Sequence, residues 1–183
     1  CTKLTGMFVI STHLKTYFES IGVDSSRVHI ITMTVDRSRF KNLKRTNTER
    51  YIAYCGKATN NKDGVDELIK AFALTSSKHS DVKLYIIGTP PNKSDESGNL
   101  ELVKRLGISD KVKFVGAVSA DDMPQILKNA EVLALDRPDN IQAKYGFPTK
   151  LGEYLLTGNP VVITSVGDIP LFLRDGYSVL LAE

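Results

Sequence analysis

The sequence predicts an α/β protein with a Rossmann-like, doubly wound parallel sheet. Short apolar runs alternate with segments of helical period, which is typical of a parallel sheet covered by helices on both faces. Three of these runs end directly in a glycine, at Gly56, Gly88 and Gly116. Right-handed crossovers between such strands produce the doubly wound arrangement.

The first forty residues carry a shorter pattern of their own. A strand, a helix and a second strand are predicted at residues 7–11, 12–21 and 28–33. The polar and basic stretch from Asp36 to Arg50 has no apolar period and is predicted to be a linker. We therefore expect residues 1–40 to be the end of a preceding domain with its linker, and residues 41–183 to form the main domain.

The main domain is predicted to alternate strands with helices. Its strands are predicted at residues 51–56, 82–88, 112–116, 131–135 and 161–164. Its helices are predicted at residues 66–78, 100–106 and 121–130, and one more begins within the segment Tyr145–Val162. Ligands of such sheets bind at the carboxyl ends of the strands. The site is therefore expected in the strand-end loops at residues 56–64, 88–92, 116–119 and 136–150.

Composition narrows the class of protein. The chain has 183 residues, 42% apolar content and a net charge of +3, as expected for an ordinary globular domain. It has no basic block typical of nucleic-acid binding, no apolar run long enough for a membrane span, and no signal-peptide pattern at its start. Cys1 and Cys55 suggest no disulfide framework, and the start at Cys1 indicates an internal fragment. We expect a cytoplasmic protein.

The segment Tyr145–Val162 is the most informative part of the chain. It joins a glycine-proline loop to a predicted helix whose first turn carries Lys150. The unpaired N–H groups of a first helical turn attract anions, and a lysine there adds a full positive charge. Glu153 follows three residues later on the same face. It is interpreted either as an ion-pair partner of Lys150 or as an acceptor for a vicinal diol such as ribose.

The loop at residues 56–64 carries two further cations, Lys57 and Lys62. Lysines that flank a helix start form a phosphate clamp of the point-charge kind, although two solvated surface lysines are the alternative. The spacing matches neither a P-loop nor the glycine pattern of a dinucleotide site.

No metal-binding pattern stands out. His13, His29 and His79 are far apart, and none has a second ligand at helical spacing. Asp136 and Asp139 are able to hold a cation, but a proline-bearing loop with helix-capping acids is the favoured interpretation. No metal site is therefore predicted.

Four stretches together resemble the carboxyl-terminal half of a GT-B glycosyltransferase of the retaining group 1 family (family 4). Residues 10–40 resemble the end of that family's amino-terminal domain and its interdomain linker. Residues 56–72 and 112–127 resemble two of its strand-end segments. The string GFPTKLGEYLLTGNPVV resembles its G-x-x-x-x-E-x-x-x-x-G-x-P-V-V motif.

The resemblance implies a nucleotide-sugar donor site that needs no separate cofactor. Lys57 and Lys62 match positions that neutralise the diphosphate of the leaving nucleotide, and Glu153 matches the position that binds the ribose hydroxyls. These three are the predicted catalytic residues. The predicted substrate-binding residues are Gly56, Val115, Gly116, Val118, Tyr145, Gly146, Phe147, Pro148, Thr149, Lys150 and Leu151. Among them, residues 115–118 are expected against the base and the amides of residues 146–149 against the diphosphate.

The resemblance also predicts the reaction and its partners. It implies transfer of a sugar, with retention, to a glycan or lipid-linked acceptor bound by an amino-terminal domain, so this chain alone is expected to be inactive. Peripheral membrane association of the full-length enzyme is left open. Tyr145 stands where the family has a glutamate and Lys57 where it has an arginine. A catalytically silent nucleotide-binding module, favoured by Tyr145, and a GT-B nucleotide-sugar epimerase are the alternatives.

Overall fold

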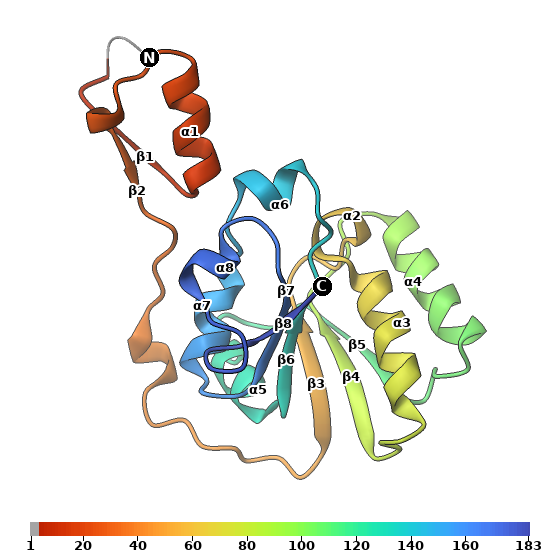
Figure 1. Ribbon diagram of the computed structural model, residues 1–183. Coiled ribbons are helices and arrows are strands. Elements are labelled where there is room, and N and C mark those ends of the chain that lie inside the picture. The colour runs from red at the N-terminus through yellow and green to blue at the C-terminus, as the bar shows by residue number, and fades with distance from the viewer. Residues whose placement is uncertain (1–3) are drawn as a thin grey trace.

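The computed structural model describes residues 4–183, which form two parallel sheets (Figure 1). The smaller sheet pairs β1 (Met7–Val9) with β2 (Val28–Ile30), and α1 (Thr12–Ser20) lies against it. We call residues 4–30, which include the 3₁₀ turn η1 (Ser25–Arg27), the N-terminal unit. The larger sheet belongs to the main domain.

The strands of the larger sheet are all parallel, in the order β5-β4-β3-β6-β7-β8. Their bounds are β3 Arg50–Cys55, β4 Val82–Ile87, β5 Val112–Gly116, β6 Val132–Leu135, β7 Val161–Thr164 and β8 Leu180–Ala182. Counted along the chain, the spatial order is third, second, first, fourth, fifth and sixth, which is the doubly wound order. It reverses between β3 and β6, and this reversal confirms the predicted fold class.

Helices cover both faces of this sheet. In Figure 1, α3 (Val65–Ser76) and α4 (Lys93–Arg105) lie to the right of the strands, whereas α5 (Met123–Asn129) and α7 (Thr149–Leu156) lie to the left. The strands between them are buried on both faces, as continuous apolar runs require. Ala53, Leu84, Leu133 and Ile163, from four neighbouring strands, are all 0% exposed.

Some elements differ from the prediction. Helix α4 begins at Lys93 rather than near residue 100, because the Asn92 side chain caps it by accepting from Asp95 N at 2.8 Å. Its first turns are polar and carry no apolar period. The second strand, β2, ends at Ile30. Four short elements were not predicted because each spans too few residues to show a period: α2 Asn60–Asp63, α6 Ile141–Tyr145, α8 Ile169–Phe172 and β8.

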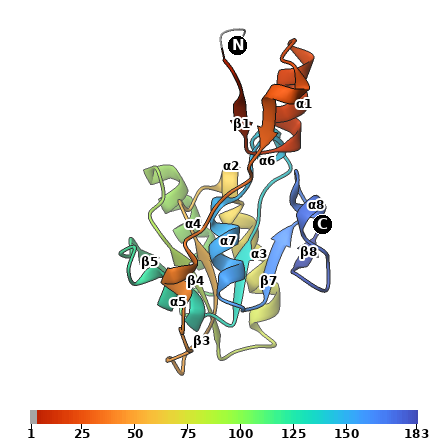
Figure 2. The same cartoon turned by 90° about the vertical axis from the view of Figure 1, so that its left-hand side faces the viewer.

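The N-terminal unit stands over the carboxyl ends of the main strands (Figures 1 and 2). Asp168, which is 1% exposed, accepts from Thr12 N and Thr12 Oγ1, each at 2.6 Å, and so caps the start of α1 from the main domain. Residues 31–49, with the 3₁₀ turn η2 (Arg37–Phe40), then run past α7 to the start of β3. The domain boundary at residue 40 stays a prediction.

Candidate functional site

Two loops meet at the switch point of the larger sheet. Residues 56–64 follow β3 and include α2, and residues 136–150 follow β6 and run through α6 into the first turn of α7. Both lie at the upper edge of the sheet in Figure 1, on the side of the N-terminal unit. They carry most of the predicted site residues.

A largely buried ion pair joins these loops. Lys150 Nζ lies 2.7 Å from Asp63 Oδ2, and the Tyr54 hydroxyl donates to the same oxygen at 2.6 Å. The ammonium also lies over the Tyr54 ring, 4.7 Å from its centroid. The side chains of Lys150 and Asp63 are 18% and 4% exposed. The cation predicted in the first turn of α7 is therefore held inside the protein by a carboxylate of α2.

Gly56 leaves the space that the Lys150 side chain occupies. A Cβ at this position would lie 2.1 Å from Lys150 Nζ and 2.6 Å from the Tyr54 hydroxyl oxygen. Any larger residue would displace the ammonium. The strand-ending glycine is therefore required by the position of the Lys150 ammonium.

Burial sets the acid–base properties of this cluster. Desolvation lowers the pKa of Lys150, although Asp63 opposes that shift, and the nearby charge of Lys62 lowers the pKa further. Desolvation and the charge of Asp63 raise the pKa of Tyr54, so its hydroxyl keeps its proton and donates. The opposite charges of Lys150 and Asp63 largely cancel, so this pair attracts an anion only weakly. An anion at the switch point would have to be held by other cations.

Lys57 and Lys62 are such cations. Both side chains are exposed, and neither forms an ion pair within residues 4–183. Lys57 directly follows Gly56 at the end of β3, and Lys62 lies in α2 close enough to Lys150 to lower its pKa. The structure therefore brings two uncompensated ammonium groups to the switch point.

Glu153 faces the linker. Its Oε1 accepts from Arg39 Nη1 at 2.7 Å, whereas its Oε2 makes no hydrogen bond within the described residues. The intrahelical pair with Lys150 does not form, because that ammonium turns to Asp63. A hollow of about 310 Å³ beside the carboxylate is lined by Thr34, Val35, Asp36, Arg39, Thr149, Lys150 and Glu153.

Tyr145 faces the N-terminal unit. Its ring packs edge-on against His13 and Tyr17 of α1, with centroid separations of 6.1 and 6.4 Å. Its carbonyl accepts from Ser11 Oγ at 2.8 Å. The side chain at the position predicted to lie near the donor sugar therefore contributes to the contact between the two parts of the chain.

The residues that follow Tyr145 lie in different surroundings. Phe147 packs edge-to-face on Phe172 of α8, 5.6 Å between centroids, and Pro148 is buried. Leu151 is 1% exposed and its N–H donates to the Pro148 carbonyl, so it supports the segment from the core and does not line the site. Thr149 is exposed at the start of α7, and no side chain caps that helix start.

The segment predicted to lie against the base is farther away. Val115 and Gly116 end β5, and Val118 lies two residues beyond it; β4 separates β5 from β3. Gly88 N donates to the Gly116 carbonyl at 2.8 Å, which ties this segment to the loop after β4. A nucleotide bound at the switch point must extend across β4 to reach it.

Arg137 is a functional candidate that the sequence pattern did not single out. It is the second residue after β6, is 4% exposed, and its Nε is buried without a hydrogen-bond partner among residues 4–183. Its backbone is fixed by Thr164, whose hydroxyl accepts from Arg137 N at 2.8 Å and donates to Arg137 O at 3.0 Å. Desolvation lowers its pKa. The available signal was an arginine two residues after a buried apolar strand.

The two acids beside Arg137 are not helix caps, so that interpretation is wrong. Asn140 caps α6, whereas burial, with the charges of Glu67 and Asp66, raises the pKa of Asp136 to about 6. Within residues 4–183, no group of three or more His, Cys, Asp or Glu side chains is placed to hold a metal ion.

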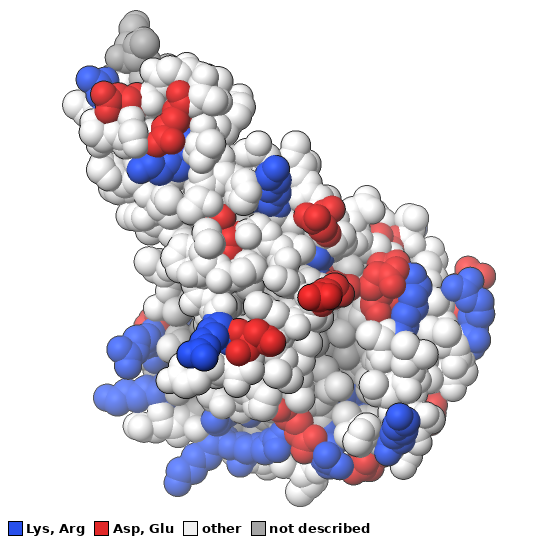
Figure 3. All heavy atoms as spheres, in the orientation of Figure 1, with Lys and Arg blue, Asp and Glu red and all other residues white. Residues whose placement is uncertain are grey.

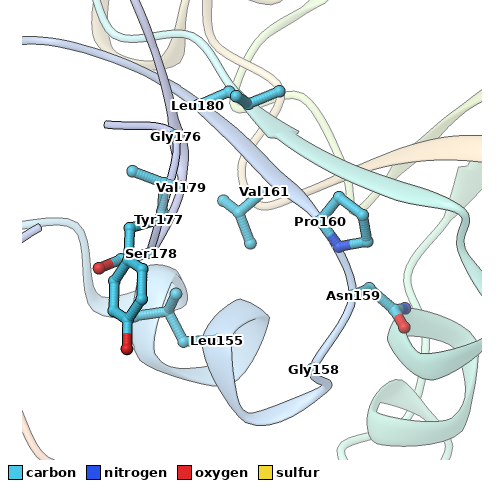
Figure 4. Close-up of a pocket in the computed structure, with 10 residues that line it drawn as sticks. All are labelled: Leu155, Gly158, Asn159, Pro160, Val161, Gly176, Tyr177, Ser178, Val179 and Leu180. Carbon is cyan, nitrogen blue, oxygen red and sulfur yellow. The ribbon is translucent and has the colours of Figure 1, made fainter. Parts of the chain in front are cut away.

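A second hollow, of about 380 Å³, lies at the amino-terminal ends of β7 and β8, away from the switch point (Figure 4). Residues 158–161, before and at the start of β7, line one side of it, and residues 176–180 line the other. Its lining residues carry no charge, so it is unsuited to a diphosphate.

Surface charge does not mark the strand-end site either. Figure 3 shows basic side chains gathered at the lower left of this face, where Figure 1 places the linker. The part of the chain that the structure describes contains no helix long and apolar enough to cross a membrane.

Comparison with known proteins places the chain among glycosyltransferases. The family described as "Glycosyl transferases group 1" matches residues 49–183. Mannosylfructose-phosphate synthase of Agrobacterium fabrum is 24% identical, covering 93% of this chain and 39% of that protein. D-inositol 3-phosphate glycosyltransferase of Mycolicibacterium vanbaalenii is 29% identical, covering 73% and 30%. The chain thus spans two fifths or less of these relatives.

Solved structures support the fold. Anabaena Alr3699/HepE in complex with UDP and glucose superimposes with a TM-score of 0.80 at 19% identity, covering 97% of this chain and 49% of that one. The C-terminal domain of a group 1 family protein (LpcC) from Francisella tularensis gives 0.67 at 18% identity, covering 82% and 80%. The fold is that of the carboxyl-terminal half of GT-B glycosyltransferases. Together with the family match over residues 49–183, this establishes that the chain belongs to the group 1 glycosyltransferases.

Proposed function

We propose that this chain is the donor-binding half of a retaining glycosyltransferase that transfers a sugar from a nucleotide-sugar to a glycan or lipid-linked acceptor. The observation that carries the proposal is the position of Lys57 and Lys62 at the switch point, where both are exposed and have no carboxylate partner among the described residues. Doubly wound sheets bind ligands at this point. The diphosphate of the donor is the anion that these lysines would hold.

The chemistry follows from the charge that develops during transfer. As the bond between sugar and diphosphate breaks, negative charge builds on the departing phosphate oxygens. Fixed cations stabilise that charge more than they stabilise the ground state, which lowers the barrier. Lys57 and Lys62 supply the charges, and the backbone N–H groups of Phe147 and of Thr149, at the uncapped start of α7, supply donors. Pro148 has no N–H, and the Gly146 N–H donates to the Gln142 carbonyl.

Glu153 is proposed to bind the ribose. Arg39 engages its Oε1, which orients the carboxylate and leaves Oε2 for the vicinal hydroxyls. The adjacent hollow of about 310 Å³ gives the sugar ring a place beside the linker. The base would then extend toward residues 115–118 at the end of β5.

The remaining parts of the proposal lie outside this chain. Because the chain spans two fifths or less of its curated relatives, the acceptor is proposed to bind a separate amino-terminal domain. This chain alone would bind donor without turnover and would need no cofactor. We place the full-length enzyme in the cytoplasm, with peripheral contact to the membrane when its acceptor is lipid-linked.

Calorimetric titration with nucleoside diphosphates and their sugars tests the donor site. UDP is the first probe because the similar Anabaena structure holds UDP, and GDP is the second. Lys57→Ala should weaken diphosphates about tenfold and leave nucleosides nearly unchanged, since a charge-assisted contact is lost. Glu153→Ala should weaken both by about 1–3 kcal/mol. Failure of every nucleotide to bind at millimolar concentration would refute the donor site.

A catalytically silent module is the second candidate. It is favoured by Tyr145, which replaces the family's glutamate and turns toward α1. Donor hydrolysis by the full-length protein separates the two: measurable release of free sugar from a bound donor supports the enzyme, and binding without release supports the silent module.

A further inference from the structure

Arg137 carries a buried charge that the described protein does not neutralise. The residue is 4% exposed, its Nε is buried without a hydrogen-bond partner, and its guanidinium forms no ion pair within residues 4–183. Burying a charge without a partner costs free energy, and a bound ligand of opposite charge offsets that cost. The surroundings of the guanidinium therefore indicate what it binds.

The guanidinium lies beside the loop that leads into α7. Its Nη2 would be 3.7 Å from a Cβ built on Gly146, so it reaches the backbone that is proposed to hold the diphosphate. The charge of Asp63 is close enough to affect the pKa of Arg137, but this carboxylate is already bound by Lys150 and Tyr54. Asp63 therefore does not satisfy the guanidinium.

Other unsatisfied polar atoms belong to the loops that flank the switch point. Five side-chain N or O atoms are buried without a partner in the described residues, and three of them lie in the two loops that flank the switch point. These three are Thr59 Oγ1, Asn60 Oδ1 and Arg137 Nε. A polar ligand at the switch point would supply the hydrogen bonds that the protein does not.

The guanidinium has the geometry for an oxyanion. Its planar donors match the two oxygens of a phosphate or carboxylate, and the two hydrogen bonds with Thr164 hold its backbone in place. We propose that Arg137 binds an oxyanion of the donor, as a fixed binding residue distinct from the exposed Lys57 and Lys62. This inference rests on the proposed donor site.

Two groups of a donor carry such oxygens. One is the diphosphate, which is expected at residues 146–149. The other is a carboxylate on the sugar, as in a uronic acid donor, because Tyr145 replaces the glutamate that would repel it. The diphosphate and the carboxylate both present anionic oxygens to the guanidinium. Probes that carry one group or the other distinguish them.

The test compares the wild-type chain with Arg137→Met, which keeps much of the side-chain volume and removes the charge. Pyrophosphate, UDP, UDP-glucose and UDP-glucuronate are titrated by calorimetry. At least a tenfold loss for pyrophosphate and all three nucleotides identifies a phosphate ligand. Unchanged pyrophosphate, with a tenfold loss only for UDP-glucuronate, identifies a carboxylate ligand. Either result supports the proposal.

The unfolding temperature shows whether Arg137 has a binding role or a structural role. Since the chain has no tryptophan, unfolding is followed by far-UV circular dichroism. Without ligand, Arg137→Met should unfold at the same or a higher temperature, because a buried unpaired charge is removed. Arg105→Met, an exposed arginine at the end of α4, is the matched control and should change neither property.

Three outcomes overturn the inference. Unchanged affinity of Arg137→Met for every probe overturns it and leaves the proposed donor site intact. A lower unfolding temperature with unchanged affinities assigns Arg137 a structural role. Wild-type protein that binds none of these four probes, and no GDP in a further titration, overturns both the inference and the donor site.

Discussion

Removing Asp63 should destabilise the protein more than any other single carboxylate-to-alanine change at the site. Asp63→Ala leaves the Lys150 ammonium enclosed with only the Tyr54 ring and hydroxyl nearby. Breaking a buried pair costs about 3–5 kcal/mol. The Lys150 side chain keeps 18% exposure, and the ring is worth about 0.5–2 kcal/mol. We therefore expect a loss near the lower end, about 3 kcal/mol.

The double variant shows whether this loss belongs to the pair. Lys150→Met leaves Asp63 buried with the Tyr54 hydroxyl as its main partner, so it should also destabilise. Asp63→Ala together with Lys150→Met removes both charges, and the second change should then cost much less than it does alone. The expected coupling energy is about 2–3 kcal/mol.

Urea unfolding followed by far-UV circular dichroism measures these free energies, because the chain has no tryptophan. Glu67→Ala is the control, since its pair with Lys70 is exposed on both sides and should be worth less than about 1 kcal/mol. The reasoning fails if the losses of the two single variants add within about 0.5 kcal/mol in the double variant.

Three further changes test the supporting structure. Gly88→Ala should lower the free energy of unfolding by at least about 3 kcal/mol, because a Cβ would meet the Gly56 carbonyl oxygen at 2.0 Å and φ is +112°. Thermal unfolding measures this loss, and a value under about 1 kcal/mol would contradict the close approach of the two backbones. Asn159→Ala should cost about 1–3 kcal/mol in urea unfolding, since its amide donates to three carbonyls at the end of α5, and an unchanged midpoint would count against this. The pKa of Asp136 is raised from 3.8 to about 6, so its ionisation disfavours folding increasingly across that interval and fully above it. Asp136→Asn should therefore stabilise the protein by about 1–2 kcal/mol at pH 8, after allowance for solvent screening, and leave it unchanged at pH 3, whereas equal effects at both pH values would exclude this cause.

The fold was largely predictable because its strands are buried on both faces. Continuous apolar runs such as those of β4 and β7 mark strands without any knowledge of tertiary contacts. The polar start of α4 was not predictable, because Asn92 and its cap define it rather than a period. β8 has three residues, too few to show a period, and it is held by pairing with β7 and by the Asp175 carboxylate, which accepts from Leu181 N.

The loops that form the site were predictable from the sequence, whereas the side-chain pairings within it were less so. Topology brings residues 56–64 next to residues 136–150 once the strand order is known, and Lys57 and Lys62 follow from that. The pairing of Lys150 with Asp63 joins positions 87 residues apart, and that of Glu153 with Arg39 joins positions 114 apart. Short-range spacing instead suggested a contact between Lys150 and Glu153, which the longer-range partners replace.

The cations around the switch point therefore differ in what they are free to do. Lys150 is bound to Asp63, so moving it to a phosphate would leave that carboxylate buried and unpaired, and its role is to hold the start of α7 against α2. Lys57 and Lys62 are solvated and exchange water for a ligand at small cost. Arg137 is 4% exposed and its Nε has no partner among the described residues, so an oxyanion that reaches it would gain a strong contact at a small further desolvation penalty on the protein side. In the proposed donor site, the positive charge available to a donor would thus come from the two exposed lysines and the buried arginine.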